Sequence, residues 1–237
     1  MTGDYQRRLD RGRRYWDRLS PVVSSLEQAA VAVDAYGLHH LDLAPGQQVL
    51  DIGCGAGAAL PSLRGAVGPT GRVLGVDNSP RMLDLARGRL AESDWVNVDV
   101  LEADFARTTW PPGGFDAAVA VFALSAMADL PGALVVAERV LRPGGRLLVV
   151  DLNLTPRGWP APLLWLVREL YRRRVGASAE DLLGAAGAVF CSVAVLDLPG
   201  HPGAGPRGRP WPPLTAFVAT TSAEEQHRAA IGPRRAG

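Results

Sequence analysis

Short apolar runs alternate along this chain with longer segments in which apolar positions recur at helical spacing. The runs are closed by glycine, proline or acidic residues and predict buried strands, because a parallel strand is covered on both faces. These strands are expected at residues 49–52, 72–76, 95–101, 115–121 and 146–150. The segments between them predict helices at residues 58–67, 81–92 and 130–141. This alternation predicts an α/β fold with a Rossmann-like, doubly wound parallel sheet.

The pattern is looser towards the two ends of the chain. Residues 5–19 predict a helix that ends near Ser20-Pro21, because the residue before a proline disfavours helical geometry. A second helix is expected at residues 26–41. After residue 151 the sequence predicts an amphipathic helix at 163–174, a short capped helix that begins near 178–181, and two strands at 191–198 and 214–221.

The first predicted strand leads into a loop in which glycine recurs at every second position. Asp51 is followed by Gly53, Gly55 and Gly57. No side chains obstruct such a turn, so a ligand can lie directly against backbone N–H groups at the start of the next helix. Asp51 lies at the carboxyl end of its strand, where open α/β sheets bind their ligands. The loop also fits a dinucleotide fingerprint, Gly53-x-Gly55-x-x-Ala58, which is a weak match on its own.

Acidic residues close the following strands as well. Asp77 follows the second strand, about 20 residues beyond the loop, where a carboxylate that accepts two ribose hydroxyls belongs. Asp104 follows the third strand and Asp151 follows the fifth. These positions place acidic side chains at the ligand-binding edge of the sheet.

Composition narrows the class of protein. The 237 residues predict one domain with elaborations, and 47% hydrophobic with 21% charged residues is ordinary for a globular protein. A net charge of +1 gives no overall electrostatic case for nucleic acid or an anionic membrane as a partner, although all 25 basic residues are arginine. The two cysteines, Cys54 and Cys191, supply neither a disulfide framework nor a metal cluster, so no metal is expected. Cys54 is expected to be a small side chain in a tight turn rather than a nucleophile.

No segment of the sequence predicts export or a membrane crossing. Residues 1–18 are charged and lack an apolar signal region, and no apolar run is long enough to span a bilayer. We therefore expect a cytoplasmic protein.

Five segments, taken in order, resemble the motifs of class I S-adenosylmethionine (SAM)-dependent methyltransferases. They read VLDIGCGAG, GVDNSPRMLDLAR, LEADF, FDAAVAVFAL and ERVLRPGGRLLVVD, and the resemblance covers most of the chain from Tyr36 to Thr220. It is closest to the small-molecule branch that resembles quinone-biosynthesis C-methyltransferases. The resemblance implies SAM as the cofactor and a C-terminal hairpin whose final strand is antiparallel to the others.

The resemblance also implies how the chain would hold the methionine and ribose parts of SAM. Asp51, Gly53 and Gly55 would hold the methionine end, largely through backbone groups. Asp77 would take the ribose hydroxyls, a role that its position at the second strand end supports independently.

The remaining implied contacts concern the adenine ring and the sulfonium. Asn78 and Met82 would flank the ribose and adenine. Asp104 would bond the adenine amino group, with Phe105 beside the ring, and Phe122 would line the sulfonium end. For Met82 and Phe122, ordinary core packing is an open alternative.

The sequence assigns no catalytic residue. Methyl transfer from a sulfonium needs chiefly a nucleophile held in line at about 3 Å. A base is needed only where the acceptor must lose a proton. The candidate bases are His39, His40, His201 and His227, of which His201, in a loop expected at residues 199–213, is best placed to border an acceptor pocket. Asp151 is a further polar residue at the site edge, with capping as its alternative role.

Aromatic residues outside the predicted sheet indicate the kind of acceptor. Trp159, Trp165 and Tyr171 suggest an apolar lid over a hydrophobic or aromatic small molecule, with ordinary packing of a helix face as the alternative. Tyr15 and Trp16 would belong to an N-terminal lid or would simply pin the first helix to the domain.

The sequence predicts three parts: a helical lid at residues 1–35, a SAM-binding methyltransferase domain at 36–222, and a polar tail at 223–237. The expected partner is a small-molecule acceptor, and a homodimer is left open. Two other functions also stay open. An NAD-type oxidoreductase is disfavoured by the acidic residue before the glycines, and a protein of the same fold could bind SAM without methylating.

Overall fold

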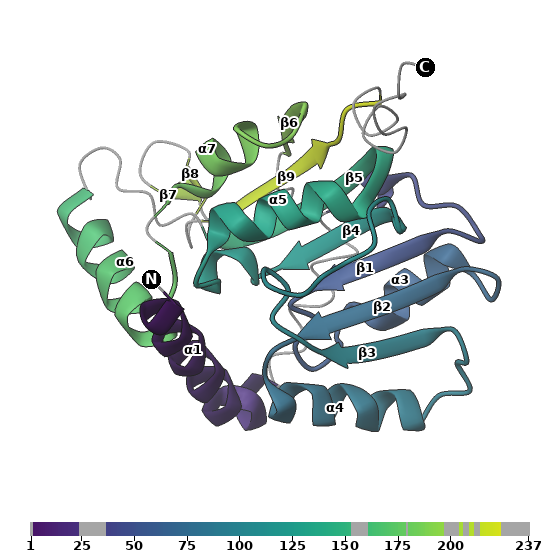
Figure 1. Ribbon diagram of the computed structural model, residues 1–237, viewed down its shortest axis with the longest axis horizontal. Helices are drawn as coiled ribbons and strands as arrows, with labels where there is room; N and C mark the ends of the chain where they lie inside the picture. The colour runs from purple at the N-terminus through teal and green to yellow at the C-terminus, as the bar shows by residue number, and fades with distance from the viewer. Residues whose placement is uncertain are drawn as a thin grey trace, which may run out of the picture.

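A central sheet organises the computed structural model, which describes residues 2–23, 37–152, 161–178, 180–196, 204–205, 209–210 and 214–223. Within these residues the sheet has seven strands in the order β3-β2-β1-β4-β5-β9-β6 (Figure 1). They are β1 Gln48–Ile52, β2 Arg72–Asp77, β3 Val98–Glu102, β4 Phe115–Val121, β5 Leu141–Leu152, β6 Ser192–Val195 and β9 Leu214–Thr220. A separate two-stranded ribbon pairs β7 Ala204–Gly205 with β8 Arg209–Pro210.

The strand directions confirm the predicted fold class. The strands β1 to β5 pair in parallel, and β9 runs antiparallel to both β5 and β6. The chain moves outward from β1 to β3 and then crosses back to β4, so the strand order reverses between β1 and β4. Such a reversal leaves a crevice at the carboxyl ends of the strands, where open α/β sheets bind ligands.

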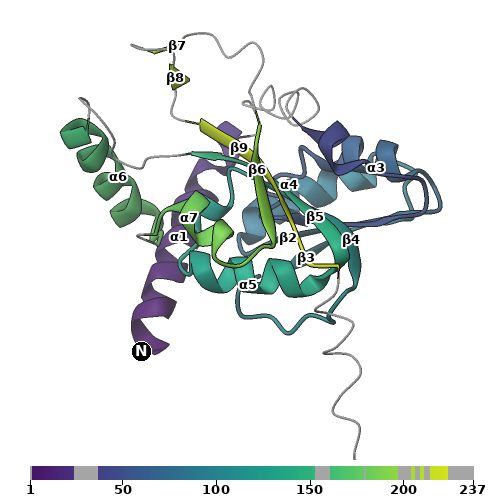
Figure 2. The ribbon, with the colours of Figure 1, turned by 90° about the horizontal axis from the view of Figure 1, so that it is seen from above.

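Helices cover both faces of the sheet and its carboxyl edge. They are α1 Thr2–Val23, η2 Leu38–Leu41, α3 Leu60–Val67, α4 Pro80–Ala91, η3 Leu124–Ala126, α5 Leu130–Val140, α6 Ala161–Val175 and α7 Leu182–Gly187. The α3 helix buries Leu60 and Leu63 against one face, while α5 and α7 bury Leu134 and Leu182 against the other. Figure 2 shows α3 and α5 on opposite sides of the sheet.

The first helix is longer than the sequence predicts, because it continues through Pro21 to Val23. A proline cannot donate the backbone hydrogen bond that residue 21 would give to the carbonyl of residue 17. The hydroxyl of Ser20 donates to that Asp17 carbonyl at 2.9 Å instead. This replacement donor explains why the expected end near Ser20-Pro21 is wrong.

Further boundaries differ from the predictions, and the strand expected at 95–101 begins at Val98. The β5 strand begins at Leu141 rather than 146, and the turn predicted at 142–145 becomes an irregularity inside the strand, with Gly144 at φ 74°. Of the helix expected at 26–41, the part at 24–36 lies outside the described residues, and Leu38–Leu41 forms a 3₁₀ helix rather than an α-helix.

The helices α1 and α6 lie beside each other at the carboxyl edge of the parallel strands (Figure 1). Their backbones approach closely, because a Cβ atom on Gly12 would lie 2.7 Å from the Val175 carbonyl oxygen. A Cβ on Gly176, which has φ 74°, would lie 2.2 Å from the Arg8 carbonyl oxygen. Glycine at these two positions therefore permits the contact.

None of the helices in the described ranges combines the length and the apolar character that a membrane crossing needs.

We expect Gly12→Ala to loosen α1 from α6, although alanine favours a helix over glycine by about 1 kcal/mol. The added methyl group would meet a backbone oxygen that cannot rotate away. Hydrogen exchange of the α1 amides should therefore become faster. The control is Gly3→Ala in the same helix, where the nearest atom is the end of the Arg7 side chain at 3.7 Å. If the α1 amides are equally protected from hydrogen exchange in both variants, the close contact of α1 with α6 at Gly12 is contradicted.

Candidate active site

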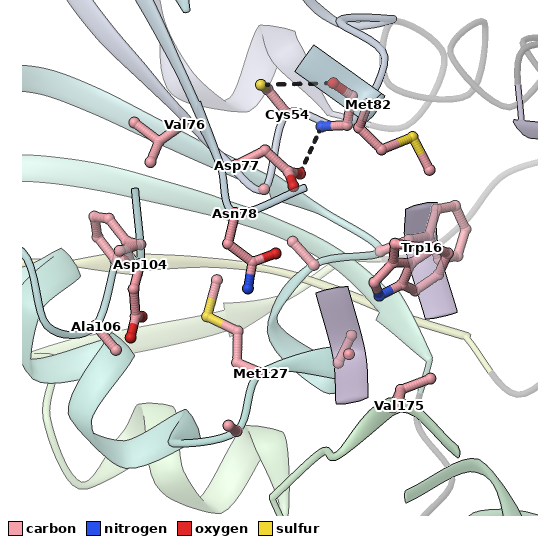
Figure 3. Close-up of a pocket in the computed structure, with 18 of the residues that line it drawn as sticks. Trp16, Cys54, Val76, Asp77, Asn78, Met82, Asp104, Ala106, Met127 and Val175 are labelled. Atoms are coloured by element: carbon pink, nitrogen blue, oxygen red, sulfur yellow. Dashed lines mark hydrogen bonds between the residues drawn. The ribbon is translucent and has the colours of Figure 1, made fainter. Parts of the chain in front are cut away.

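A cavity of about 580 Å³ lies at the carboxyl ends of β1 to β4, beneath α1 and α6. This volume is within the range of small-molecule sites in proteins, about 300–1,000 Å³. Figure 3 shows side chains from the strand ends, from the segment after η3 and from α1 around this cavity.

All nine residues that the sequence analysis singled out as cofactor contacts line this one cavity. They are Asp51, Gly53, Gly55, Asp77, Asn78, Met82, Asp104, Phe105 and Phe122. The structure therefore brings them together, while their individual contacts with a cofactor stay a prediction.

The glycine loop forms the floor of the cavity. The N–H groups of Gly53 and Cys54 both donate to the Val76 carbonyl, which ties the loop to β2. Gly53 has φ 70°, and a Cβ there would lie 2.5 Å from the Cβ of Ala123. Gly55 has φ 54°, and a Cβ there would meet nothing within 4 Å. Gly53 is therefore required for packing, whereas Gly55 leaves open space beside the backbone.

Asp51 is a buried carboxylate with an unused oxygen. Its side chain is 2% exposed, and Oδ2 has no hydrogen-bond partner among the described residues. Burial, with the nearby charge of Asp77 as the second cause, raises the pKa of Asp51 to about 7. A cationic group of a ligand in the cavity would stabilise the charged form.

Asp77 is held in place by backbone N–H groups. Its Oδ2 accepts from the Gly55 N–H at 2.9 Å (Figure 3). Its Oδ1 accepts from the Ser79 N–H at 2.8 Å. Burial raises the pKa of Asp77 on balance, and these hydrogen bonds oppose the rise. The carboxylate is therefore oriented at the end of β2, with further lone pairs for a ligand.

Asp104 forms a hydrogen bond that the sequence analysis missed. The Tyr5 hydroxyl of α1 donates to Asp104 Oδ2 at 2.6 Å. Burial and the Asp104 carboxylate raise the pKa of the Tyr5 phenol, so it stays a donor. The Arg107 guanidinium lies 4.3 Å from the centre of the Tyr5 ring and pairs with Asp129 at 3.0 Å.

Two more side-chain contacts attach α1 to the strand ends. Ser79 donates its hydroxyl to Asp17 Oδ1 at 2.6 Å, and Arg13 pairs with Glu102 at 3.1 Å. The cavity face of α1 carries Tyr5, Arg8, Leu9, Gly12 and Trp16. Their spacing of three and four residues marks one helix face and was the signal in the sequence that could have identified them.

The exit of β4 carries an unusual backbone conformation. Phe122 has φ 52°, which is rare for an aromatic residue, and its N–H donates to the Val150 carbonyl at 2.8 Å. Phe122 lines the cavity next to Ala123, whose Cβ leaves no room for a side chain at Gly53. Strained backbone of this kind gathers at functional sites.

Tyr171 lies at the far end of the cavity, close to Asp151, which does not itself line the cavity. Asp151 is fully buried and accepts from the N–H groups of Ser125 and Leu152 at 2.9 and 2.7 Å. Burial raises its pKa to about 6. Tyr171 of α6 lines the cavity, and burial raises the pKa of its phenol, with the Asp151 charge as a further cause.

The other aromatic and sulfur candidates separate into two groups. Trp16 lines the cavity, and Tyr15 packs edge-on against it with ring centroids 5.2 Å apart. Trp165 is 59% exposed on α6, so it does not act as part of the apolar lid over the cavity. Trp159 lies outside the described residues. Burial raises the pKa of the Cys54 thiol, in keeping with a packed side chain rather than a nucleophile.

The candidate histidine bases do not meet the cavity in the described part of the chain. His39 and His40 lie in η2, before the amino end of β1, whereas the cavity lies at its carboxyl end. His201 and His227 lie outside the described residues.

Comparison with known proteins gives relatives with methyltransferase names. A family model described as a methyltransferase domain matches residues 49–145. A demethylmenaquinone methyltransferase of Tropheryma whipplei is 32% identical over 189 residues, which cover 80% of this chain and 74% of that protein. An uncharacterised 37.1 kDa protein in transposon TN4556 of Streptomyces fradiae is 38% identical over 135 residues, covering 57% of this chain and 37% of that protein.

A solved structure shows the same fold. The crystal structure of a SAM-dependent methyltransferase from Aquifex aeolicus superposes with a TM-score of 0.55 at 20% identity. The match covers 85% of this chain and 96% of that one.

The buried Asp51 predicts a pH dependence of folding. Its pKa is about 7 in the folded chain and near 3.8 in an ordinary setting, so the folded state binds more protons between about pH 4 and 7. Its contribution to stability is therefore present below about pH 4 and is lost as the pH rises to 7. We expect Asp51→Asn to remove this loss and to raise the free energy of unfolding at pH 8 by up to about 4 kcal/mol.

Urea unfolding of both chains at a series of pH values measures the effect. The control is Asp42→Asn, because Arg146 lowers the pKa of this exposed carboxyl and its stabilisation is lost as the pH falls. If the free energy of unfolding changes with pH in the same way in the wild type and in Asp51→Asn, the pKa of Asp51 is not raised in the folded chain.

Proposed function

Since the chain belongs to the class I SAM-dependent methyltransferases of the quinone-methyltransferase type, we propose that its cavity holds SAM along the ends of β1 to β3 and a hydrophobic aromatic acceptor at the ends of β4 and β5. The single observation that carries this proposal is the convergence of nine motif residues on one cavity.

The residues present suit a SAM molecule on two observations. Gly55 leaves open space beside its backbone, so a ligand can lie against the loop. Asp51 lines the cavity, and its Oδ2 has no hydrogen-bond partner among the described residues. SAM carries an ammonium group and a sulfonium, either of which favours the ionised carboxylate.

We assign the parts of the cofactor to the cavity by the order of the strand ends. Asp51, Gly53 and Gly55 would hold the methionine end. Asp77, fixed by two backbone N–H groups, would accept the ribose hydroxyls through its remaining lone pairs. This arrangement follows the motif resemblance and the positions of these residues along the cavity.

The adenine end would lie beneath the first turns of α1. Asp104 would accept from the adenine amino group through Oδ1, because Oδ2 already accepts from Tyr5. Asn78, Met82 and Phe105 would enclose the ribose and the ring. The α1 helix would then be the lid of the cofactor site, which agrees with its three side-chain contacts to the strand ends.

The acceptor end is apolar with one polar corner. Met127, Leu152 and Val175 line it, and Tyr171 faces it near Asp151. A phenol whose pKa is raised is a hydrogen-bond donor at neutral pH, so Tyr171 would orient an acceptor oxygen rather than remove a proton. A hydroquinone ring, as the name of the Tropheryma whipplei relative suggests, would suit these surroundings.

Bound SAM supplies an electrophilic methyl group on a good leaving group. The chain's own residues would hold the acceptor carbon in line with the methyl group at about 3 Å, which can account for much of the rate enhancement. Phe122 and Met127 would exclude water from the path between them. Methylation of a ring carbon releases one proton, and Asp151, whose pKa is raised to about 6 by burial, is a group near that corner that could take it up.

The cytoplasmic location and the homodimer stay predictions. An NAD-type oxidoreductase is the weaker alternative, because Asp51 lies before the glycines.

We expect Asp77→Ala to weaken SAM binding by about 1–3 kcal/mol, which is the cost of losing hydrogen bonds to a charged group. Isothermal titration calorimetry with SAM measures the change. The matched control is Asp99→Ala, an exposed carboxylate of β3 that pairs with Arg72 at 2.8 Å. If both variants bind SAM like the wild type, the ribose does not lie at Asp77.

The acceptor assignment predicts turnover of a reduced naphthoquinol that lacks its ring methyl group and carries a short isoprenoid chain. Mass spectrometry should show one methyl group added to the ring, with an equal amount of S-adenosylhomocysteine. Tyr171→Phe should lower kcat/KM for this acceptor by about tenfold, the loss of one hydrogen bond in the transition state. SAM affinity should change less than about twofold.

Tyr15→Phe removes a hydroxyl from a residue outside the cavity lining and serves as the control. If the chain methylates an amine of similar size and does not methylate the quinol, the proposed class of acceptor is wrong. The proposed SAM site would still stand.

A further inference from the structure

The α6 helix turns its apolar stripe outward. Leu163 and the residues three, four and seven positions after it lie on one helix face. These residues, Leu163, Leu166, Val167 and Leu170, are 60%, 48%, 43% and 54% exposed. Trp165 flanks them. Of the nine large apolar side chains that are exposed among the described residues, five belong to this helix. A helix that packs on a domain normally buries such a stripe.

The side of α6 that adjoins this stripe accounts for the attachment of the helix to the domain. Tyr171 and Val175 line the cavity, and Val175 with Gly176 packs against α1. Figures 1 and 2 both show α6 at the margin of the molecule, far from the sheet. The packing of the described part of the chain therefore leaves the outward stripe unexplained.

A stripe of arginine residues lies on the neighbouring helix. Arg7, Arg11, Arg14 and Arg18 are all exposed and are spaced by four, three and four residues along α1. They lie on the side of α1 opposite its cavity face, which carries residues 5, 8, 9, 12 and 16. Arg14 and Arg18 have no acidic partner among the described residues.

The two stripes meet at the carboxyl end of α6. The Arg11 guanidinium donates to the Arg173 carbonyl oxygen at 3.1 Å. Arg173 and Arg174 are exposed there, and Glu169 pairs with Arg173 at 2.7 Å. The basic stripe of α1 therefore reaches the end of the helix that carries the apolar stripe.

We propose that these two stripes form a docking surface for an anionic lipid bilayer. Leucine, valine and tryptophan side chains of an amphipathic helix insert at the boundary between headgroups and acyl chains. Arginine residues beside them bind anionic headgroups and keep their stems over apolar surface. The net charge of +1 for the whole chain does not reveal this surface, because acidic residues offset the arginines, including Asp4 beside Arg7 and Glu169 beside Arg173.

A second copy of the chain is a poorer occupant of this surface. In a two-fold contact the same patch lies on both partners, so the arginine stripes would approach each other. Like charges at such a contact are unfavourable, whereas anionic headgroups complement them.

Docking would place the acceptor end of the cavity at the bilayer. The same helix carries the outward stripe and, on its inner face, Tyr171 and Val175 of the cavity lining. An acceptor with a long apolar chain partitions into lipid, so it could reach the cavity without crossing water. This inference goes beyond the proposed function, because vesicle binding needs neither SAM nor an acceptor.

Co-sedimentation of the full chain with vesicles tests the proposal. The vesicles are phosphatidylcholine alone or phosphatidylcholine mixed with phosphatidylserine, at low and at high salt. We expect binding to the mixed vesicles at low salt and weaker binding at high salt, because salt screens the arginine charges. Leu166→Glu/Leu170→Glu and Arg14→Glu/Arg18→Glu should each lower the partition coefficient about tenfold or more.

Two double variants serve as matched controls and should bind like the wild type. Val135→Glu/Val195→Glu replaces exposed apolar residues of α5 and β6, and Arg81→Glu/Arg87→Glu makes the same charge change on α4. Circular dichroism and SAM titration establish that each variant is folded.

Three outcomes would overturn the proposal. The wild type could fail to sediment with either kind of vesicle, or the Leu166→Glu/Leu170→Glu variant could sediment as well as the wild type. Light scattering could instead show a wild-type dimer that this variant separates, which would make the surface an interface between copies. If the chain binds vesicles but methylates no acceptor, the proposed function fails while the docking proposal stands. The two failures can therefore be told apart.

Discussion

Two carboxylates meet at the ends of adjacent strands, and burial raises the pKa of both. Asp51 is buried with an unused oxygen, and its pKa is raised to about 7 by burial and by Asp77. Asp77 is fixed by backbone N–H groups of Gly55 and Ser79. The fold holds this negative charge at a cost to its own stability, and the bare glycine backbone leaves room beside it for a ligand. The rest of the site is arranged around a ligand that brings a positive charge.

The roof of the cavity depends on a second constraint, the close approach of two helix backbones. The α1 helix is attached to the strand ends by Tyr5, Arg13 and Asp17, and it is attached to α6 through positions that only glycine fits. Because these contacts run along the whole length of α1, the helix cannot lift at one end while it stays attached at the other without breaking several of them. The cofactor end and the acceptor end are therefore covered by one connected layer.

The sequence predicted the sheet and the position of the site well, because both follow from local rules. Glycines after an apolar strand and acidic residues at strand ends have a meaning that needs no knowledge of distant contacts, so nine lining residues could be named in advance. The misses depend on tertiary contacts. The hydroxyl of Ser20 lets α1 pass Pro21, the Tyr5–Asp104 bond joins residues 99 apart in sequence, and Trp165 lies on the outer face although aromatic residues usually mark a core.

The outward stripe of α6 shows why an amphipathic pattern alone does not tell which face of a helix meets the domain. The spacing of apolar residues shows that one side of a helix is apolar, and that side normally packs against the domain. In α6 the cavity requires Tyr171 and Val175 on the inner face, and the contact with α1 requires Gly176 at its end. These demands fix the rotation of the helix, so its leucine stripe must face outward. An exposed stripe of this kind lowers solubility unless something covers it. The neighbouring arginine stripe favours an anionic lipid bilayer as the covering surface, because its headgroups are negatively charged and its interior is apolar.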